Sequence, residues 1–116
     1  MSVESDQAAI VQALDAVPDI TGYPDESPMM NAGDAIVQWA GWEPQGAPLV
    51  FEATWKVFLV LGAEPRTAMR FLDQHLMAVL EAVHPLLYII KVDRVQFPTA
   101  TAGNLLGVEI TAEKES

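Results

Sequence analysis

Residues that could do chemistry are few and scattered in this chain of 116 residues. His75 falls inside a predicted helix, and His84 falls at the end of the same helix, next to Pro85. A zinc site of the helical type needs a second ligand four residues away, and neither histidine has one. We therefore predict no catalytic or metal-binding role for either. We interpret His84 as a side chain whose charged form suits a helix C-terminus.

Other catalytic and ligand-binding motifs are absent from the sequence as well. It has no cysteine, no GxSxG motif and no glycine-rich loop of the phosphate-binding type. Asp25 and Glu26 could bind a hard cation if a third carboxylate lay nearby. They lack the ligand spacing of a calcium loop, so a solvated acidic turn is the better interpretation. These patterns favour a protein that is not an enzyme and that uses no metal or cofactor.

The composition is typical of one soluble globular domain spanning residues 1–116. A chain of this length supports a single core, and 51% of its residues are hydrophobic. The longest apolar run, residues 57–63, is seven residues long, whereas a membrane helix needs about 20. The absence of cysteine fits a reducing cytosol, and acids near the N-terminus argue against a signal peptide. We expect a protein made in the cytoplasm, with no membrane partner.

The acidic charge is concentrated in one half of the chain. The net charge is −10, and residues 1–55 contain nine acids and no lysine or arginine. Proteins that bind nucleic acid tightly need a basic patch to replace the counterions of the phosphates, and none is visible. An acidic surface can serve solubility alone; it also suits a surface that must not bind DNA, or one that meets a basic partner.

Hydrophobic periodicity predicts an α+β domain in which about four strands form a sheet backed by two helices. The predicted order is helix, strand, strand, helix, strand, strand, with these bounds: 3–17, 35–42, 50–61, 65–83, 88–97 and 104–112. Residues 19–34 form a long loop with room for a short strand at 20–23. Residues 113–116 are expected to fray.

The longest predicted strand, FEATWKVFLVLG, carries more apolar surface than two helices can cover. Phe51, Ala53, Trp55 and Val57 share one parity, but Phe58 and Val60 make the opposite face apolar too. In the strand before it, Trp39 and Trp42 are three residues apart and point to opposite faces if that strand is regular. In the strand 88–97 the apolar parity changes near Asp93–Arg94, which predicts a bulge there.

Self-association would hide this surplus of apolar side chains, although core packing within the chain is the alternative. Aromatic side chains are enriched at interfaces because they offer a large area at low entropic cost. From strand parity alone, we expect four residues at a subunit or partner interface: Phe58, Val60, Trp42 and Phe97.

The order of elements resembles the tail terminator proteins of long-tailed, siphovirus-type bacteriophages. The resemblance covers nearly the whole chain: a first helix ending near VPDITGYP, a proline-containing loop and the strand AIVQW. The strand FEATWKVFLVL, the helix RTAMRFLDQHLMAVLEAV and the strands in IIKVDRVQFPTATAGNLLGVEI follow. The most telling part of the resemblance is the strand WKVFLVL, which leads into a helix with a central LDQHL.

This resemblance implies a structural virion protein without enzymatic activity, located at the head-proximal end of the phage tail. Such proteins form a ring, expected to be a hexamer, which ends polymerisation of the tail tube and presents a surface to head-completion or neck proteins. Genomic DNA passes through the centre of the ring without specific binding, and an acidic lumen would let it slide.

Two other interpretations remain open at this point. One is a head-completion protein or another ring-forming neck protein. The other is a small cellular α+β module that binds an apolar ligand between sheet and helix, with the second face of the long strand lining the pocket.

Overall fold

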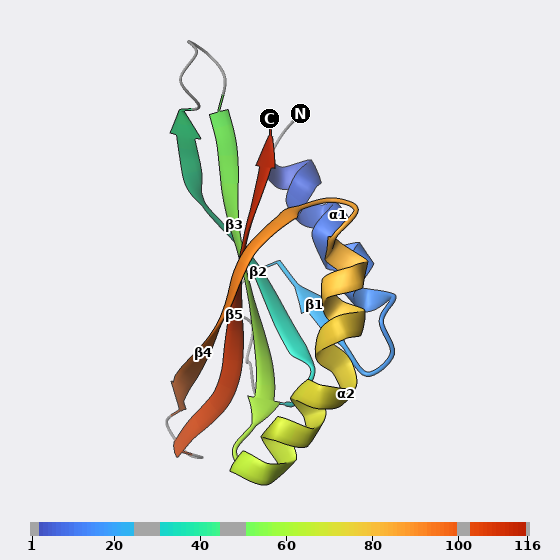
Figure 1. The fold of residues 1–116 in the computed structure, drawn as a ribbon, viewed down its shortest axis with the longest axis vertical. Helices are drawn as coiled ribbons and strands as arrows, with labels where there is room; N and C mark the ends of the chain where they lie inside the picture. Colours follow the sequence, from blue (N-terminus) through green and yellow to red (C-terminus); the bar gives the residue numbers. More distant parts are fainter. Residues whose placement is uncertain (1–2, 25–30, 45–50, 100–102, 116) are drawn as a thin grey trace.

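The computed structural model describes residues 3–24, 31–44, 51–99 and 103–115 of the chain. Its five strands form one sheet, and both helices pack against the same face of that sheet (Figure 1). The elements along the chain are α1 (Val3–Asp15), β1 (Thr21–Tyr23), β2 (Asp34–Pro44), β3 (Phe51–Gly62), α2 (Pro65–Val83), β4 (Tyr88–Thr99) and β5 (Gly103–Glu115). The strand order across the sheet is β1-β2-β3-β5-β4.

The structure confirms the α+β class and a single sheet backed by two helices, but it adds a fifth strand. The short segment after α1 forms β1, which pairs in parallel with β2 from Thr21↔Asp34 to Tyr23↔Ile36. The chain end also differs from the expected frayed tail, because β5 continues to Glu115 in register with β3. The predicted bounds of α2, 65–83, match the observed helix.

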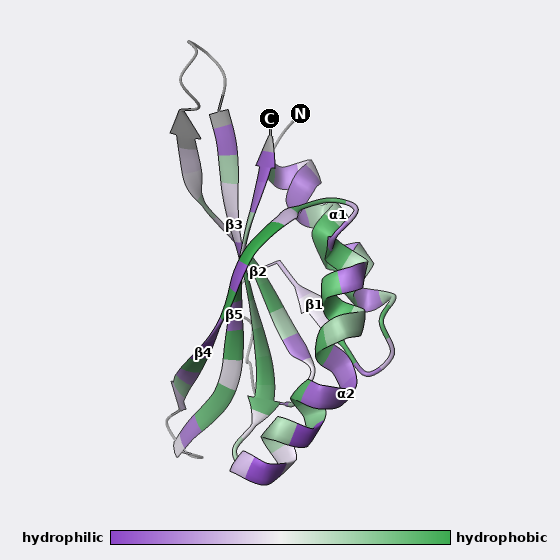
Figure 2. Ribbon diagram, in the orientation of Figure 1, coloured by the Kyte–Doolittle hydropathy of each residue, from purple (hydrophilic) through white to green (hydrophobic). Residues whose placement is uncertain are grey.

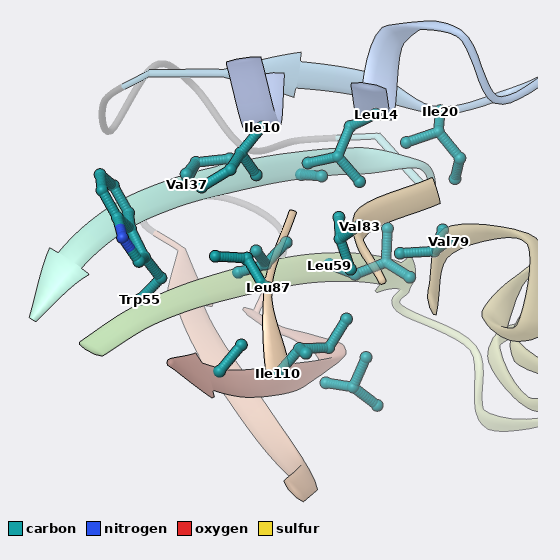
Figure 3. Close-up of a cluster of buried hydrophobic side chains, with 14 of the residues drawn as sticks. Ile10, Leu14, Ile20, Val37, Trp55, Leu59, Val79, Val83, Leu87 and Ile110 are labelled. Atoms are coloured by element: carbon teal, nitrogen blue, oxygen red, sulfur yellow. The ribbon is translucent and has the colours of Figure 1, made fainter. Parts of the chain in front are cut away.

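The main core lies between the helices and the covered face of the sheet. Trp55, Val57 and Leu59 of β3 are fully buried there, in the parity that the sequence predicts. The core side chains come from both helices and from several strands, as Figure 3 shows for Ile10, Leu14, Ile20, Val37, Trp55, Leu59, Val79, Val83, Leu87 and Ile110. Hydrophilic residues alternate with hydrophobic ones along α2 (Figure 2), as expected for a helix with one buried side.

Local capping explains where α2 begins. Glu64 accepts hydrogen bonds from Thr67 Oγ1 (2.7 Å), Thr67 N (2.7 Å) and Arg66 N (3.0 Å). These bonds, the one from the Thr67 hydroxyl first, hold the pKa of Glu64 below its ordinary value of 4.5. Pro65 follows at the first helical position, where its missing N–H leaves no hydrogen bond unmade.

Polar contacts at both ends of α1 hold this helix on the sheet. Asp15, its last residue, accepts a hydrogen bond from Gly22 N of β1 at 2.7 Å. A Cβ at position 22 would lie 2.7 Å from the carbonyl oxygen of Val11, so glycine is needed for this close approach. At the other end of α1, Asp6 Oδ1 lies 2.6 Å from Lys114 Nζ of β5.

β2 and β4 each contain a β-bulge. In β2 the register passes from Trp39↔Trp55 to Gly41↔Thr54, so Ala40 is the extra residue. In β4 it passes from Ile89↔Ala112 to Lys91↔Thr111, so Ile90 is extra. The bulge predicted near Asp93–Arg94 is therefore wrong in position, because those two residues pair regularly with Glu109 and Val108.

Candidate assembly interface

The described residues contain no group of three or more acidic, histidine or cysteine side chains that could hold a metal ion. His75 has a structural setting: its ring stacks on Phe71, with centroids 4.0 Å apart. His75 Nδ1 lies 3.0 Å from Phe71 O, and Nε2 lies 3.4 Å from Asp19 Oδ2. The ring thus joins α2 to the turn that follows α1. Asp25 and Glu26 lie outside the described residues.

His84 lies at the C-cap of α2, where its backbone N–H donates to Leu80 O at 2.9 Å. Its position agrees with the helix-end location expected from the sequence. Neither described helix is both long and apolar enough to span a membrane.

A groove of about 400 Å³ runs beside α1 and ends at Pro24. Its lining includes two carboxylates, Glu4 and Asp15, and two amides, Gln7 and Gln12. Gln7 Nε2 donates to the carbonyl oxygens of Pro24 (2.6 Å) and Val37 (2.9 Å), so this amide ties α1 to the side of β2. The groove does not lie on the second face of β3, where a ligand-binding module would need it.

The helix-free face of the sheet carries an aromatic pair. Phe58 of β3 and Phe97 of β4 meet edge to face with centroids 6.0 Å apart, and both are half-buried. Gly107 lies between them on β5, where an added Cβ would come 2.4 Å from the Phe97 ring and 2.5 Å from Leu59 O. Gly107 therefore gives Phe97 room to lie across the sheet toward Phe58.

Val60 does not share this exposure. Its side chain is 0% exposed in the single chain, as is that of Ile36 on the same face of neighbouring β2. The premise that nothing within the chain covers Val60 is therefore wrong, and Val60 is not accessible to a neighbouring subunit in this conformation. Phe58 and Phe97 keep part of their surface in solvent.

Trp42 belongs to the C-terminal part of β2. This end of the strand extends beyond the helices (Figure 1). We call residues 39–44 of β2, with residues 51–54 of β3, the arm. Trp39 and Trp42 are 44% and 52% exposed, and their rings meet at 5.3 Å in an edge-to-face arrangement. The expectation that they point to opposite faces is wrong, because the bulge at Ala40 resets the register and puts both on the face of Trp55.

The four predicted interface residues thus fall into different settings. Phe58 and Phe97 form one pair, Trp42 belongs to a second pair with Trp39, and Val60 is buried. Sequence reasoning missed Trp39 as a partner of Trp42 and also missed Tyr88 and Ile90 of β4, which are 74% and 46% exposed. The sequence did contain a signal for this exposure, namely Ile89 and Ile90 next to a tyrosine. Consecutive side chains of a regular strand point to opposite faces, so the two isoleucines cannot both face one core.

Comparison with protein-family models found no match, and comparison with curated protein sequences found none. The resemblance to tail terminators therefore stays a prediction based on the order and character of the elements.

Proposed function

We propose that this protein is a tail terminator of a long-tailed bacteriophage. In this role it forms a ring, expected to be a hexamer, on the head-proximal end of the tail tube. The ring stops tube polymerisation and joins the tail to head-completion or neck proteins. The proposal assigns the protein to the virion and assigns it no reaction.

The observation that supports this role best is the amount of aromatic surface outside the core. Phe58 and Phe97 lie on a sheet face with no helix, and Trp39 and Trp42 lie on the arm with about half of their surface in solvent. Contiguous exposed apolar surface marks interaction sites in soluble proteins. A ring subunit needs several such surfaces, because it contacts two neighbours, the tube and the neck.

The charge supports the part of the proposal that concerns DNA. A net charge of −10 repels a polyanion. The described basic side chains are partly neutralised: Lys56 lies 2.8 Å from Glu109, Lys91 lies 3.3 Å from Asp93, and Lys114 is paired with Asp6. Such a chain suits a ring through which DNA moves without specific binding.

The test is absolute mass by light scattering over a range of protein concentrations, with and without purified siphovirus tail tubes. We expect ring-sized assemblies at least when tubes are present, and electron micrographs should show them at one tube end. A species that is monomeric at every concentration and does not bind tubes would refute the proposal. Binding to head-completion sites rather than to tube ends would instead favour the alternative of a neck ring protein.

Phe58→Asp tests the helix-free face directly. The substitution removes an edge-to-face pair worth about 0.5–1.5 kcal/mol beyond its buried area and places a charge on a half-exposed site. We expect the monomer to stay folded while tube binding or ring assembly weakens at least about tenfold, as for an interface aromatic. Met77→Asp is the control for the added charge, because Met77 is an apolar side chain on α2 that is 63% exposed and belongs neither to the Phe58–Phe97 pair nor to the arm. Equal effects of the two substitutions would contradict the reasoning.

A further inference from the structure

One side of α1 carries a stripe that is acidic at both ends and apolar in the middle. Its members recur at helical spacing and all line the groove beside α1: Glu4, Ala8, Val11 and Asp15. Both acids are exposed, and they stand about 16 Å apart along the helix axis at 1.5 Å per residue. Carboxylates this far apart cannot bind one metal ion together, because each ligand must lie within about 2.6 Å of the ion. The stripe instead suits a ligand with several separate positive charges.

The groove leads from α1 to the exposed tryptophans of the arm. Gln7, which lines the groove, donates from Nε2 to Val37 O of β2 at 2.9 Å. Trp39 lies two residues after Val37, about 7 Å along the strand, and on the same face, because both pair with buried residues of β3. Trp42 extends this surface, since its ring meets the ring of Trp39 at 5.3 Å. We call these adjoining residues the acidic-aromatic surface: Glu4, Ala8, Val11, Asp15, Trp39 and Trp42.

The charge around the acidic-aromatic surface has one sign. α1, β1 and β2 all belong to residues 1–55, which contain nine acids and no lysine or arginine. Lys114 of β5 lies in the same row as Trp42, but its ammonium group is 2.6 Å from the carboxylate of Asp6. A nucleic acid would be repelled here, and a second copy of the chain also carries a net charge of −10. Charge complementarity therefore favours a different, basic partner.

The two tryptophans indicate which base that partner should present. The face of an indole ring is the best aromatic site for a cation, and the planar guanidinium group of arginine stacks on it. The bulge at Ala40 disfavours the addition of a strand along this edge, so the contact has to be made by side chains. The apolar middle of the stripe can pack against the methylene stems of long basic side chains.

We propose that the acidic-aromatic surface binds an arginine-rich segment of a partner protein. One guanidinium group stacks on Trp39 or Trp42, and further basic groups lie beside Glu4 and Asp15. The inference goes beyond the tail terminator role and does not depend on it, because it uses only the charge, the groove and the exposed aromatic pair of a single chain.

The test is an NMR titration of the ¹⁵N-labelled protein with octa-arginine, which is about 27 Å long when extended and so exceeds the length of the stripe. We expect the indole N–H signals of Trp39 and Trp42 to shift more than the signal of the buried Trp55. The backbone signals of Phe58 and Phe97, on the opposite face of the sheet, should stay in place. No shift at the arm, or larger shifts at the two phenylalanines, would overturn the proposal.

Octa-lysine and spermine distinguish between kinds of cationic ligand. Octa-lysine has the charge of octa-arginine but no planar group that stacks on indole, so it should bind at least about threefold more weakly. Spermine should bind more weakly than either peptide. Equal affinities of the two peptides would overturn the role of the tryptophans. Spermine binding as tight as that of octa-arginine would indicate a polyamine site and overturn the proposal of a protein partner.

A charge-matched pair of variants separates this surface from the effect of net charge. Glu4→Gln/Asp15→Asn should weaken octa-arginine binding about fivefold, as expected for the loss of two exposed ion pairs. Asp73→Asn/Glu81→Gln removes two exposed acids from α2 and changes the net charge by the same amount, but should change the affinity less than about twofold. Equal losses from the two variants would show that net charge alone drives binding, and would overturn the proposal.

A second pair of variants tests the aromatic part of the surface. Trp39→Ala/Trp42→Ala should lower the affinity for octa-arginine at least about tenfold, since two desolvated cation–π contacts are lost. Met69→Ala/Met77→Ala removes side chains of α2 that are 67% and 63% exposed, and should leave the affinity unchanged. Far-UV circular dichroism checks that each variant is folded, and light scattering measures self-association. A tryptophan variant that loses self-association but keeps its affinity for octa-arginine would show that the surface binds a second copy, and would overturn the proposal.

The outcomes separate this surface from the proposed function. Octa-arginine binding at the acidic-aromatic surface of a chain that does not bind tail tubes would refute the tail terminator role and leave the surface standing. Tube binding without octa-arginine binding would overturn the inference about the surface alone.

Discussion

Lys114→Met tests how the sheet holds the N-terminal end of α1. Lys114 Nζ lies 2.6 Å from Asp6 Oδ1, and the two side chains are only 21% and 11% exposed. Methionine keeps most of the packing of the lysine stem but leaves the Asp6 carboxylate without its ion-pair partner. Removing one member of a fully buried ion pair costs about 3–5 kcal/mol. Solvent still screens part of this pair, so we expect a loss of about 2–3 kcal/mol in the free energy of unfolding.

The assay is urea unfolding followed by far-UV circular dichroism, supported by thermal melts. In a domain of this size the expected loss corresponds to a fall of roughly 8–12 °C in Tm. Lys91→Met is the matched control, because Lys91 pairs with Asp93 at 3.3 Å with exposures of 61% and 47%. An exposed pair of that kind contributes about 0–1 kcal/mol.

The double variant Asp6→Leu/Lys114→Met separates the ion pair from simple packing. Replacing both partners by apolar side chains avoids a buried, unpaired charge, so this variant should be more stable than Lys114→Met alone. If Lys114→Met costs no more than Lys91→Met, the Asp6 carboxylate does not depend on Lys114 and the reasoning is wrong.

Two further substitutions test other parts of the fold. Gly107→Ala should cost about 1–3 kcal/mol from overpacking, because the new Cβ meets the Phe97 ring and Leu59 O; repeating it in a Phe97→Ala background should reduce that cost, and an unchanged cost would contradict the proposed role of Gly107. Glu64→Gln tests the lowered pKa of Glu64 at the α2 cap. The ionised Glu64 side chain stabilises the folded state fully at pH values above its ordinary pKa of 4.5, and this stabilisation is lost as the pH falls through the lower pKa of the folded state. The variant should therefore be less stable than the parent near neutral pH, with a difference that narrows in acid, whereas Glu81→Gln on the same helix should show no such convergence.

The sequence predicts α2 to the residue because all of its signals are local. Pro65 marks its start, the apolar repeat marks its buried side, and the His84–Pro85 pair marks its end. Glu64 is the part that sequence reasoning missed, although an acid before Pro65 with Thr67 three residues on is a recognisable cap.

The bulges could not be placed from the sequence because a bulge depends on the register of the partner strand. Regular alternation along β2 would put Trp39 and Trp42 on opposite faces, but Ala40 does not pair with β3 and the two side chains lie on the same face. In β4 the apolar parity changes because the strand has apolar side chains on both of its faces, and not because its register shifts at Asp93–Arg94. Val92 faces the helices, while Phe97 lies across Gly107 on the opposite face.

The candidate interface was predictable only as a surplus of apolar side chains. Parity identifies Phe58 and Val60 as facing away from the helices, but it does not tell whether the same chain covers them. The structure separates the two, with Val60 buried and Phe58 half-exposed. Gly107 was the available clue to the pairing of Phe58 with Phe97, because a glycine inside an alternating strand often marks a close approach by another group.

The positions of the three tryptophans make intrinsic fluorescence a probe of assembly. All three lie on β2 and β3 and face the same way, and Trp39 and Trp42 are within 5.3 Å of each other. Trp55 is fully buried, and its indole N–H has no hydrogen-bond partner among the described residues, so its emission should be blue-shifted relative to the exposed pair. Intrinsic fluorescence therefore reports on the environment of the arm and of Trp55 next to it. A blue shift of the emission on assembly would show, without any added label, that the arm had become buried.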